Sequence, residues 1–338
     1  MAETDYTKRV ERRETDGEDY RELPAQVARE VIKDVEQASL ALQLANVKSM
    51  STREEKLTLL DSFPDAYWLN GTTDYAALSS GDGVNNASGS QRAKDSQPKR
   101  TTKVTWNQKA TVAEEMAVLV AIPDNYVADS GAPLFDEIRP LIATAIAKKV
   151  DDAVFFGVDS PFVEPGIVES AILHGNIVTV GSTADLAADI ALLGEEAGEE
   201  GVDITRFVSG PGFKWKLPGL RSADGFPIYS PPSQGFPGTI YGLPIDEQKN
   251  GTWDKELALL LAGEWDKVRI GIRQDITFSI SDSATIVDPA TQKVVYSAFQ
   301  QDGKVLRAVV RLAYVVVNPV RHLGNLFPFW VLQDQTLS

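Results

Sequence analysis

The residues with the most obvious potential for acid–base chemistry are four adjacent pairs of carboxylates. They are Glu114–Glu115, Asp151–Asp152, Glu195–Glu196 and Glu199–Glu200. Neighbouring residues on a helix project about 100° apart, so two adjacent acids seldom share one site. We therefore interpret each pair as a solvated surface or an interface salt bridge, rather than as a general acid–base centre.

Other catalytic signatures are also missing from the sequence. Cysteine does not occur, which excludes disulfides, thiolate metal sites and cysteine nucleophiles. The two histidines, His174 and His322, are too few for a multi-histidine metal cluster. No phosphate-binding glycine loop and no G-x-S-x-G nucleophile motif is present. Asp82, Asn85 and Asn86 lack the spaced ligands of a calcium loop, so we expect a flexible polar tip there and no cofactor.

Charge is distributed unevenly along the chain. The formal net charge is −15, and a negative surface repels polyphosphate, which argues against sequence-specific nucleic-acid binding. Residues 185–203 contain seven acids and no base, whereas residues 91–109 contain six bases and one acid. Each tract is either a solvated face or part of a contact in which the basic tract meets an acidic surface on another copy. Lys94, Lys99 and Arg100 are thus candidate contacts between subunits.

Four arginines lie in predicted strands of the closing third, which are otherwise rich in β-branched residues. They are Arg269, Arg273, Arg307 and Arg311. Guanidinium groups suit bidentate pairing with carboxylates across an interface. The alternation of side chains along a strand equally allows these arginines to line the solvated face of a sheet. Both interpretations stay open.

The element that must position much of the chain is the segment 112–157. Val118–Ile122 form an apolar run of strand length, which Pro123 closes. Pro133 suits the first turn of a helix, and apolar residues then recur at helical spacing until Gly157, which is placed to cap the helix end. At roughly 1.5 Å per residue this helix would be about 35 Å long. That length points to a mechanical protein.

An arm and a hairpin are predicted before this segment. Apolar spacing predicts one helix from Pro24 to about Leu44 and a second, short helix at 52–60. Strand patterns on both sides of a polar, glycine-rich stretch predict a long β-hairpin at 66–110. Trp68 and Trp106 are candidate cross-strand anchors at its base, with ordinary core packing as the alternative.

The rest of the chain predicts an α/β region followed by antiparallel strands. A strand is expected at 172–180, a helix at 183–200 and a strand at 207–210. Further strands follow from the pattern of apolar residues, at 268–273, 276–280, 305–312 and 314–317.

The order of these elements resembles that of the major capsid proteins of tailed bacteriophages. Those proteins have the Hong Kong phage type of fold, which encapsulins share. The resemblance covers about residues 66–317. It is carried by the long helix with its glycine end, by Asp224–Gly225–x–Pro227 and Gly242–x–Pro244, and by the closing runs GEW, IGIRQDITFSIS and FQQDGKVLRAVVRLAYVVV.

The resemblance implies an α+β fold with four parts. They are an N-terminal arm (1–65), an extended β-hairpin or E-loop (66–110), a peripheral domain with a long spine helix (111–158 and 265–316) and an axial domain (159–264 and 317–338). It also implies a non-enzymatic virion protein, assembled in the host cytoplasm through hexamers and pentamers into an icosahedral shell around double-stranded DNA. A portal and a separate scaffolding protein are the expected partners, the presence of a decoration protein stays open, and no membrane is involved.

Two finer expectations concern covalent processing. Some members of this family cross-link a hairpin lysine to an asparagine of a neighbour, with a glutamate as base. Lys94 and Lys99 lie in the hairpin and Asn318 lies near the closing strands, but no glutamate follows Glu264. We therefore expect no cross-links. About 64 residues precede the hairpin, which is too short for a long cleaved scaffold together with an arm.

Two other classes of function compete with the phage shell. An encapsulin-type nanocompartment shell has the same fold, although the long glycine- and serine-rich hairpin favours a phage protein. A soluble hydrolase with an α/β core would require a catalytic constellation that the sequence does not show.

Overall fold

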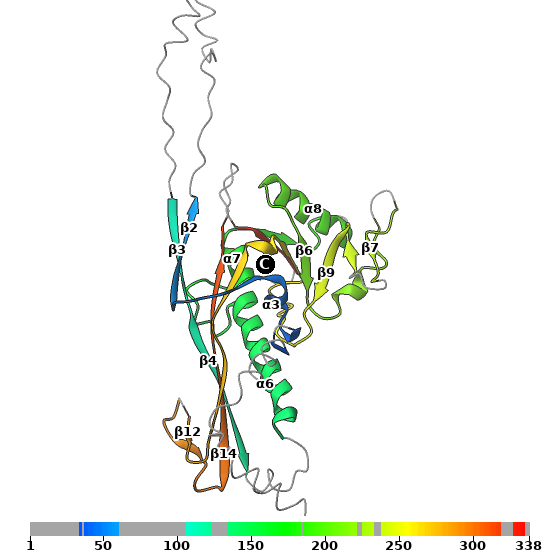
Figure 1. Cartoon of the computed structure of the whole chain (residues 1–338). Helices are drawn as coiled ribbons and strands as arrows, with labels where there is room; N and C mark the ends of the chain where they lie inside the picture. The colour runs from blue at the N-terminus through cyan, green and yellow to red at the C-terminus, as the bar shows by residue number, and fades with distance from the viewer. Residues whose placement is uncertain are drawn as a thin grey trace, which may run out of the picture. The chain divides into compact units, whose positions relative to one another are not determined.

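The computed structural model describes residues 34–35, 37–60, 106–123, 134–183, 185–221, 225–232, 238–288, 290–318 and 327–334. The chain divides into two compact units, Met1–Glu55 with Ala110–Ser338 and Lys56–Lys109. Figure 1 shows helices and strands mixed along the chain.

The described elements of the first half begin with α3 (Leu40–Leu44), β1 (Asn46–Ser49), β2 (Glu54–Leu60), β3 (Trp106–Val112) and β4 (Glu114–Pro123). They continue with α6 (Leu134–Asp151), the π-helix η1 (Asp152–Phe156), α7 (Ile167–Leu173), β5 (Ile177–Thr179) and α8 (Leu186–Glu199). The second half contains β6 (Arg206–Ser209), the 3₁₀ helix η2 (Phe213–Lys216), β7 (Tyr229–Ser230), β8 (Thr239–Ile240), β9 (Leu243–Glu247) and β10 (Leu260–Gly263). It ends with the 3₁₀ helix η3 (Trp265–Lys267), β11 (Val268–Ser281), β12 (Thr285–Val287), β13 (Val294–Ser297), β14 (Gly303–Val316) and β15 (Phe329–Gln333).

A four-stranded sheet with the order β1-β11-β14-β4 forms the first layer of the larger unit. β14 pairs antiparallel with both β11 and β4, while β1 joins the edge in parallel with β11. Side chains of β14 share one hydrophobic core with Ile142, Ile146 and Val150 of α6, and α6 lies beside this sheet in Figure 1. Burial of this shared apolar surface holds helix and sheet together.

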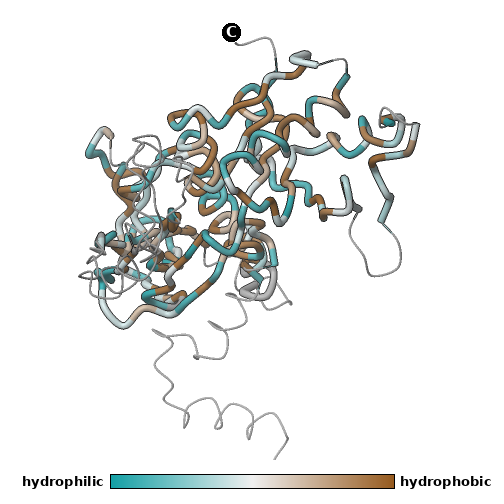
Figure 2. The backbone as a smooth tube through the Cα atoms, turned by 90° about the horizontal axis from the view of Figure 1, so that it is seen from above, coloured by the Kyte–Doolittle hydropathy of each residue, from teal (hydrophilic) through white to brown (hydrophobic). Residues whose placement is uncertain are grey.

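A seven-stranded sheet with the order β5-β15-β10-β6-β9-β8-β7 forms the second layer. It has a hydrophobic core of its own, in which Ile190 and Leu193 of α8 contact strand residues such as Phe207 and Leu260. Figure 2 shows hydrophobic and hydrophilic residues alternating over short distances along the tube. This is the pattern expected where each element buries one face.

Several predicted elements are confirmed. The long helix ends at Gly157, whose φ of 69° lies in the left-handed region that favours glycine. Its last five residues before Gly157 widen into the π-helix η1, which the apolar spacing did not predict. The helix at 183–200 corresponds to α8, and the strand at 207–210 to β6. The strands at 268–273 and 276–280 are one strand, β11, with register shifts near Gln274 where the two predicted runs separate.

Three predictions are wrong, one wholly and two in part, in the described residues. The expected helix at 52–60 is the strand β2, because its half-buried and exposed side chains alternate with period two and it pairs with β3. The expected helix from Pro24 to Leu44 is broken at Ser39, which is extended and starts the separate helix α3. The expected strand at 172–180 is in fact the end of α7 followed by the short strand β5.

Candidate functional site

A buried carboxylate at the end of α6 connects the arm to the body of the larger unit. The side chain of Asp151 has no solvent exposure. One of its oxygens accepts hydrogen bonds from the Ser39 hydroxyl at 2.6 Å and from the Ala41 N–H at 3.0 Å. The other accepts from the Leu40 N–H at 3.2 Å. Ser39 is also the N-cap of α3, so Asp151 supplements the local cap from a distant part of the sequence.

The same carboxylate also holds the segment between β9 and β10. The side-chain amides of Gln248 and Asn250 both donate to Asp151, the latter at 2.6 Å. The Asn250 oxygen in turn accepts from the Thr252 hydroxyl at 2.8 Å. We call Asp151, Ser39, Gln248 and Asn250 the arm anchor. It joins the arm, α6 and the seven-stranded sheet at one point.

Two physical effects act in opposite directions on this carboxyl group. Burial raises the pKa of Asp151, because it penalises the charged form. The hydrogen bonds from Ser39, Ala41, Gln248 and Leu40 oppose that rise. All five partner groups are donors, so both oxygens must act as acceptors and the ionised form satisfies the site best.

The sequence interpretation of the Asp151–Asp152 pair as a solvated surface or interface salt bridge is wrong for Asp151. Its position on α6 carried a signal, because Ala147 four residues before and Val154 three residues after are both buried. An acid on the apolar side of a helix requires buried donors. The sequence also carried a signal for a break at Ser39. Val35 and Leu40 are five residues apart, whereas residues on one face of a helix repeat every three or four.

The second candidate site lies on an exposed side of the four-stranded sheet. Arg311 donates from Nε and Nη2 to one carboxylate oxygen of Glu115, at 2.9 Å and 2.6 Å. Arg307 donates to the Ser279 hydroxyl at 3.1 Å. We call these four residues the arginine face. Both arginines are exposed, and Leu119, which pairs with Arg307 in register, is 51% exposed.

The four predicted arginines do not form one cluster. Arg307 and Arg311 lie four residues apart on β14. Arg273 donates instead to the backbone carbonyl of Ser51, after β1. Arg269 is half-buried and lies in register between β1 and β14. Within the single subunit, Arg307 and Arg311 are exposed and Arg273 makes an internal contact, so a solvated face and a contact with a neighbour both stay open for the two exposed arginines.

The remaining predicted contacts lie mostly outside the described residues. This holds for Trp68, Lys94, Lys99 and Arg100, and for the candidate calcium ligands Asp82, Asn85 and Asn86. Trp106 is described, begins β3 and is 65% exposed.

Most of the other paired acids meet solvent or an arginine side chain, whereas Glu200 is half-buried. Glu114 and Glu115 are on the strand β4 rather than on a helix, and Glu114 lies 3.7 Å from Arg53. Glu195, Glu196 and Glu199 are exposed on α8. Among the residues that the structure describes, no group of three acids or histidines could hold a metal ion, and no helix is long and apolar enough to cross a membrane.

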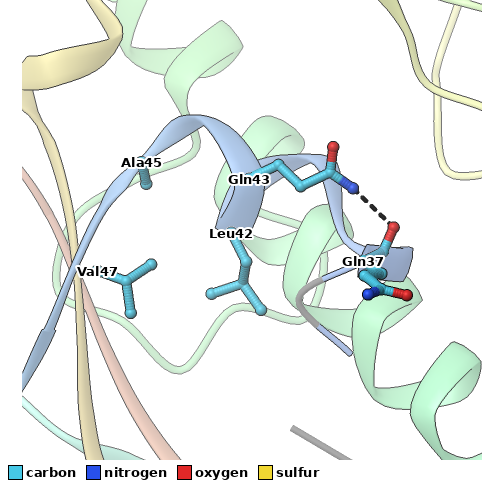
Figure 3. A pocket seen from close by; sticks show the side chains of 5 residues that line it. All are labelled: Gln37, Leu42, Gln43, Ala45 and Val47. Atoms are coloured by element: carbon cyan, nitrogen blue, oxygen red, sulfur yellow. Dashed lines mark hydrogen bonds between the residues drawn. The ribbon is translucent and has the colours of Figure 1, made fainter. Parts of the chain in front are cut away.

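A groove of about 600 Å³ lies beside the arm anchor and opens to the surface. Its lining comes from Gln37, Leu42, Gln43, Ala45 and Val47. Figure 3 shows the Gln43 amide donating to the Gln37 carbonyl, at 2.6 Å. The lining residues that the structure describes carry no charged or nucleophilic side chain, so this part of the groove offers a surface for packing rather than a place for chemistry.

Comparisons with known proteins identify the family of this chain. The phage capsid family matches residues 23–321. The major capsid protein of Staphylococcus phage 80alpha is 23% identical over 290 residues, which cover 85% of this chain and 79% of that protein. A solved structure from Microbacterium phage Oxtober96 is 31% identical, with a TM-score of 0.70 and coverage of 88% of this chain and 91% of that chain. One from Mycobacterium phage Adephagia is 27% identical, with a TM-score of 0.68 and coverage of 89% and 91%. Because the family match spans most of the sequence, this chain belongs to the phage capsid family.

Proposed function

We propose that this protein is the major capsid protein of a tailed phage. In this proposal it assembles through hexamers and pentamers into the icosahedral head shell around double-stranded DNA. The observation that carries the proposal is the family match over residues 23–321, together with solved phage structures that cover about nine-tenths of the chain. The relatives named above come from phages, which favours a phage head over an encapsulin compartment.

The two sheets of the larger unit support a division of labour within the subunit. The four-stranded sheet with α6 corresponds to a peripheral domain and its spine helix. The seven-stranded sheet corresponds to an axial domain, whose loops gather around the symmetry axes of the shell. Residues 66–110 form the E-loop, in which β3 begins, and residues 1–65 form the arm, which contains β2, the strand that pairs with β3. The domain boundaries inferred from the sequence are kept as part of this proposal.

The assembly energy is distributed over many modest contacts. Each contact is repeated around closed symmetry, so small local complementarity is multiplied over the shell. Exposed apolar side chains supply such contacts, among them Val295 on β13 at 64% exposure and Phe299 just after β13 at 82%. The negative net charge suits an inner wall that does not hold packaged DNA.

The same proposal includes partners that the chain needs in the cell. They are a separate scaffolding protein and a portal, and the particle is assembled in the host cytoplasm. Denaturing gels of mature particles should show monomers, because the chain lacks a glutamate after Glu264 to act as base. A ladder of covalent oligomers in the unmodified protein would contradict this.

Electron microscopy of sedimented particles tests the function directly. Full-length protein, expressed with the neighbouring head genes, should form closed icosahedral shells of one size. A portal at one vertex supports the phage head, whereas a portal-free shell loaded with an enzyme would support an encapsulin.

Reversing the charge of Lys99 and Arg100 should reduce assembly. Unchanged assembly would show that these two residues make no important contact between subunits.

A further inference from the structure

The 3₁₀ helix η2 presents a tryptophan to solvent on a firmly held base. Trp215 is 86% exposed, while Phe213 and Leu217 on either side of it are buried at 5% and 0%. The two buried residues fix the short helix on the seven-stranded sheet and leave the indole outside. Tryptophan is the residue most enriched at the energetic centre of protein interfaces. An exposed indole on a rigid base is therefore a candidate docking residue.

The surroundings of Trp215 are positively charged. Lys214 and Lys216 flank it, and Lys216 and Lys255 line an adjacent pocket of about 130 Å³. Within the described ranges none of these lysines forms an ion pair. We call Lys214, Trp215, Lys216 and Lys255 the lysine–tryptophan surface.

Two of the carboxylates near this surface already accept hydrogen bonds from backbone groups. Glu247 accepts a hydrogen bond from the Gly212 N–H at 2.6 Å, and Asp254 accepts from the Glu256 N–H at 2.8 Å. A free acidic side chain from another molecule would therefore find unpaired ammonium groups beside an aromatic face.

The complementary charge lies at the end of α8. Glu195, Glu196 and Glu199 are exposed in its last turns, and that end has no basic residue. The carboxyl end of a helix carries partial negative charge, so acids there are unfavourable unless a cation approaches. Among the described residues these three glutamates have no ion-pair partner. A positively charged group from another molecule would therefore be favourable at this end of α8.

The two surfaces flank the strand β6 along the chain. α8 leads into the start of β6, and η2 follows its end; both α8 and β6 are labelled in Figure 1. A strand of four residues separates its ends by about 13 Å. Complementary patches at different places on one subunit favour a head-to-tail contact, and such contacts close into rings when the rotation allows.

We propose that the lysine–tryptophan surface of one copy docks onto the acidic end of α8 of the neighbouring copy in the same ring. The lysines pair with Glu195, Glu196 and Glu199, and Trp215 covers the helix end. The inference rests on the proposed function, because it requires rings of identical subunits.

Thiol trapping tests this contact, since the natural chain has no cysteine. A variant with both Lys216→Cys and Glu196→Cys is assembled into particles and treated with a short bifunctional thiol cross-linker. Denaturing gels should show a ladder of covalent oligomers up to the ring size, whereas each single variant should stay monomeric because no second thiol lies opposite its cysteine. The matched control combines Glu196→Cys with Lys249→Cys, an exposed lysine after β9, and should show no ladder.

The outcomes separate the two proposals. Intact particles without a ladder, or a ladder equal to that of the Lys249 control, would overturn the proposed contact and leave the capsid function standing. Failure of the unmodified protein to form particles with its head genes would instead contradict the capsid function.

Charge exchange provides a second, independent measurement. Lys214→Glu with Lys216→Glu should lower the particle yield about tenfold, the scale of an interface hot spot. Glu195→Lys with Glu199→Lys should do the same, and the fourfold variant should recover most of the yield. Thermal unfolding of the free subunit should fall in none of the variants that carry Glu195→Lys and Glu199→Lys, because lysines at the carboxyl end of α8 are favourable there, so a lower particle yield would report the lost contact. A fourfold variant as poor as either double variant would contradict the contact.

Discussion

The arm anchor and the arginine face both join distant segments through a carboxylate, but in opposite surroundings. Asp151 is fully buried, and donors from the arm and the β9–β10 segment surround it. Glu115 and Arg311 each keep about half of their side-chain surface in water, at 49% and 46% exposure. A buried acceptor that is removed leaves donors unpaired, each at a cost of about 1–3 kcal/mol, whereas an exposed ion pair contributes about 0–1 kcal/mol.

This difference separates two tasks that a shell subunit has to perform. The buried anchor fixes the arm against α6 and the seven-stranded sheet, so that each subunit presents the same shape to its neighbours. The exposed pair of Glu115 and Arg311 contributes little to that shape, because both side chains are half-solvated.

Replacing Asp151 by alanine should have the largest effect. The change leaves the Ser39 hydroxyl, two backbone N–H groups and two amides without their acceptor, and we expect a loss of about 3 kcal/mol of unfolding free energy or more. Denaturant unfolding of the unassembled subunit measures it, and limited proteolysis should cleave the arm faster. Asp152→Ala is the control, with an expected change within about 0.5 kcal/mol because that side chain is half-exposed. Equal losses of unfolding free energy for Asp151→Ala and Asp152→Ala would contradict the stabilising role of the arm anchor.

Gly166→Ala should have the next largest effect, through the helix end to which Asp151 belongs. A Cβ at Gly166 would lie 2.4 Å from the Gly157 nitrogen and 2.5 Å from the Phe156 carbonyl carbon. These are backbone atoms, so the turn after η1 must shift, at about 1–3 kcal/mol. Gly198→Ala in α8 is the matched control, because its Cβ meets nothing within 4 Å and alanine favours a helix. The control should be neutral or stabilising, and a neutral Gly166→Ala would show that the turn is pliable.

Periodicity predicted the parts of this molecule that depend on their own sequence. The end of the long helix at Gly157 follows from local backbone preference, and α8 follows from its apolar spacing. Periodicity failed at 52–60, where pairing with β3 decides the structure. Acids such as Glu54 and Glu55 suit an exposed strand edge as well as a first helical turn, so local propensity could not separate the two states.

The arm anchor was missed for a related reason. Its members lie about one hundred positions apart, for example Ser39 and Asp151 or Asp151 and Asn250. No local pattern connects such residues, and a pair of adjacent acids is usually solvated. The arginine face was partly predicted, because strand alternation placed Arg307 and Arg311 together, while the contact of Arg273 with Ser51 depends on how the arm returns along β11.

Changing Ser39 should lower the stability of the subunit by a smaller amount, and it tests the two roles of this residue in the arm anchor. Ser39→Ala removes one hydrogen bond to Asp151 and the cap of α3, at about 1 kcal/mol. Ser39→Asp separates the two roles, since aspartate is ordinarily as good a cap as serine. Beside the buried Asp151 carboxylate, however, a second negative charge is repelled, so we expect the aspartate variant to be less stable than the alanine variant. Thermal unfolding of both variants measures the difference, and the reverse order would mean that Asp151 is held protonated.

The smallest effect on the stability of the subunit is expected at the arginine face. This measurement most directly separates the stability of the free subunit from the contacts made in the assembled shell. In a double-mutant cycle of Arg311→Ala and Glu115→Ala, the coupling energy in the unassembled protein should lie below about 1 kcal/mol, because both side chains are half-solvated. Raising the salt concentration should reduce it further. In assembled particles the same cycle should give a larger coupling if a neighbour covers this face, since exclusion of water strengthens the pair. Equal coupling before and after assembly would show that the arginine face stays in water in the shell, and it would confine the contacts between subunits to other surfaces.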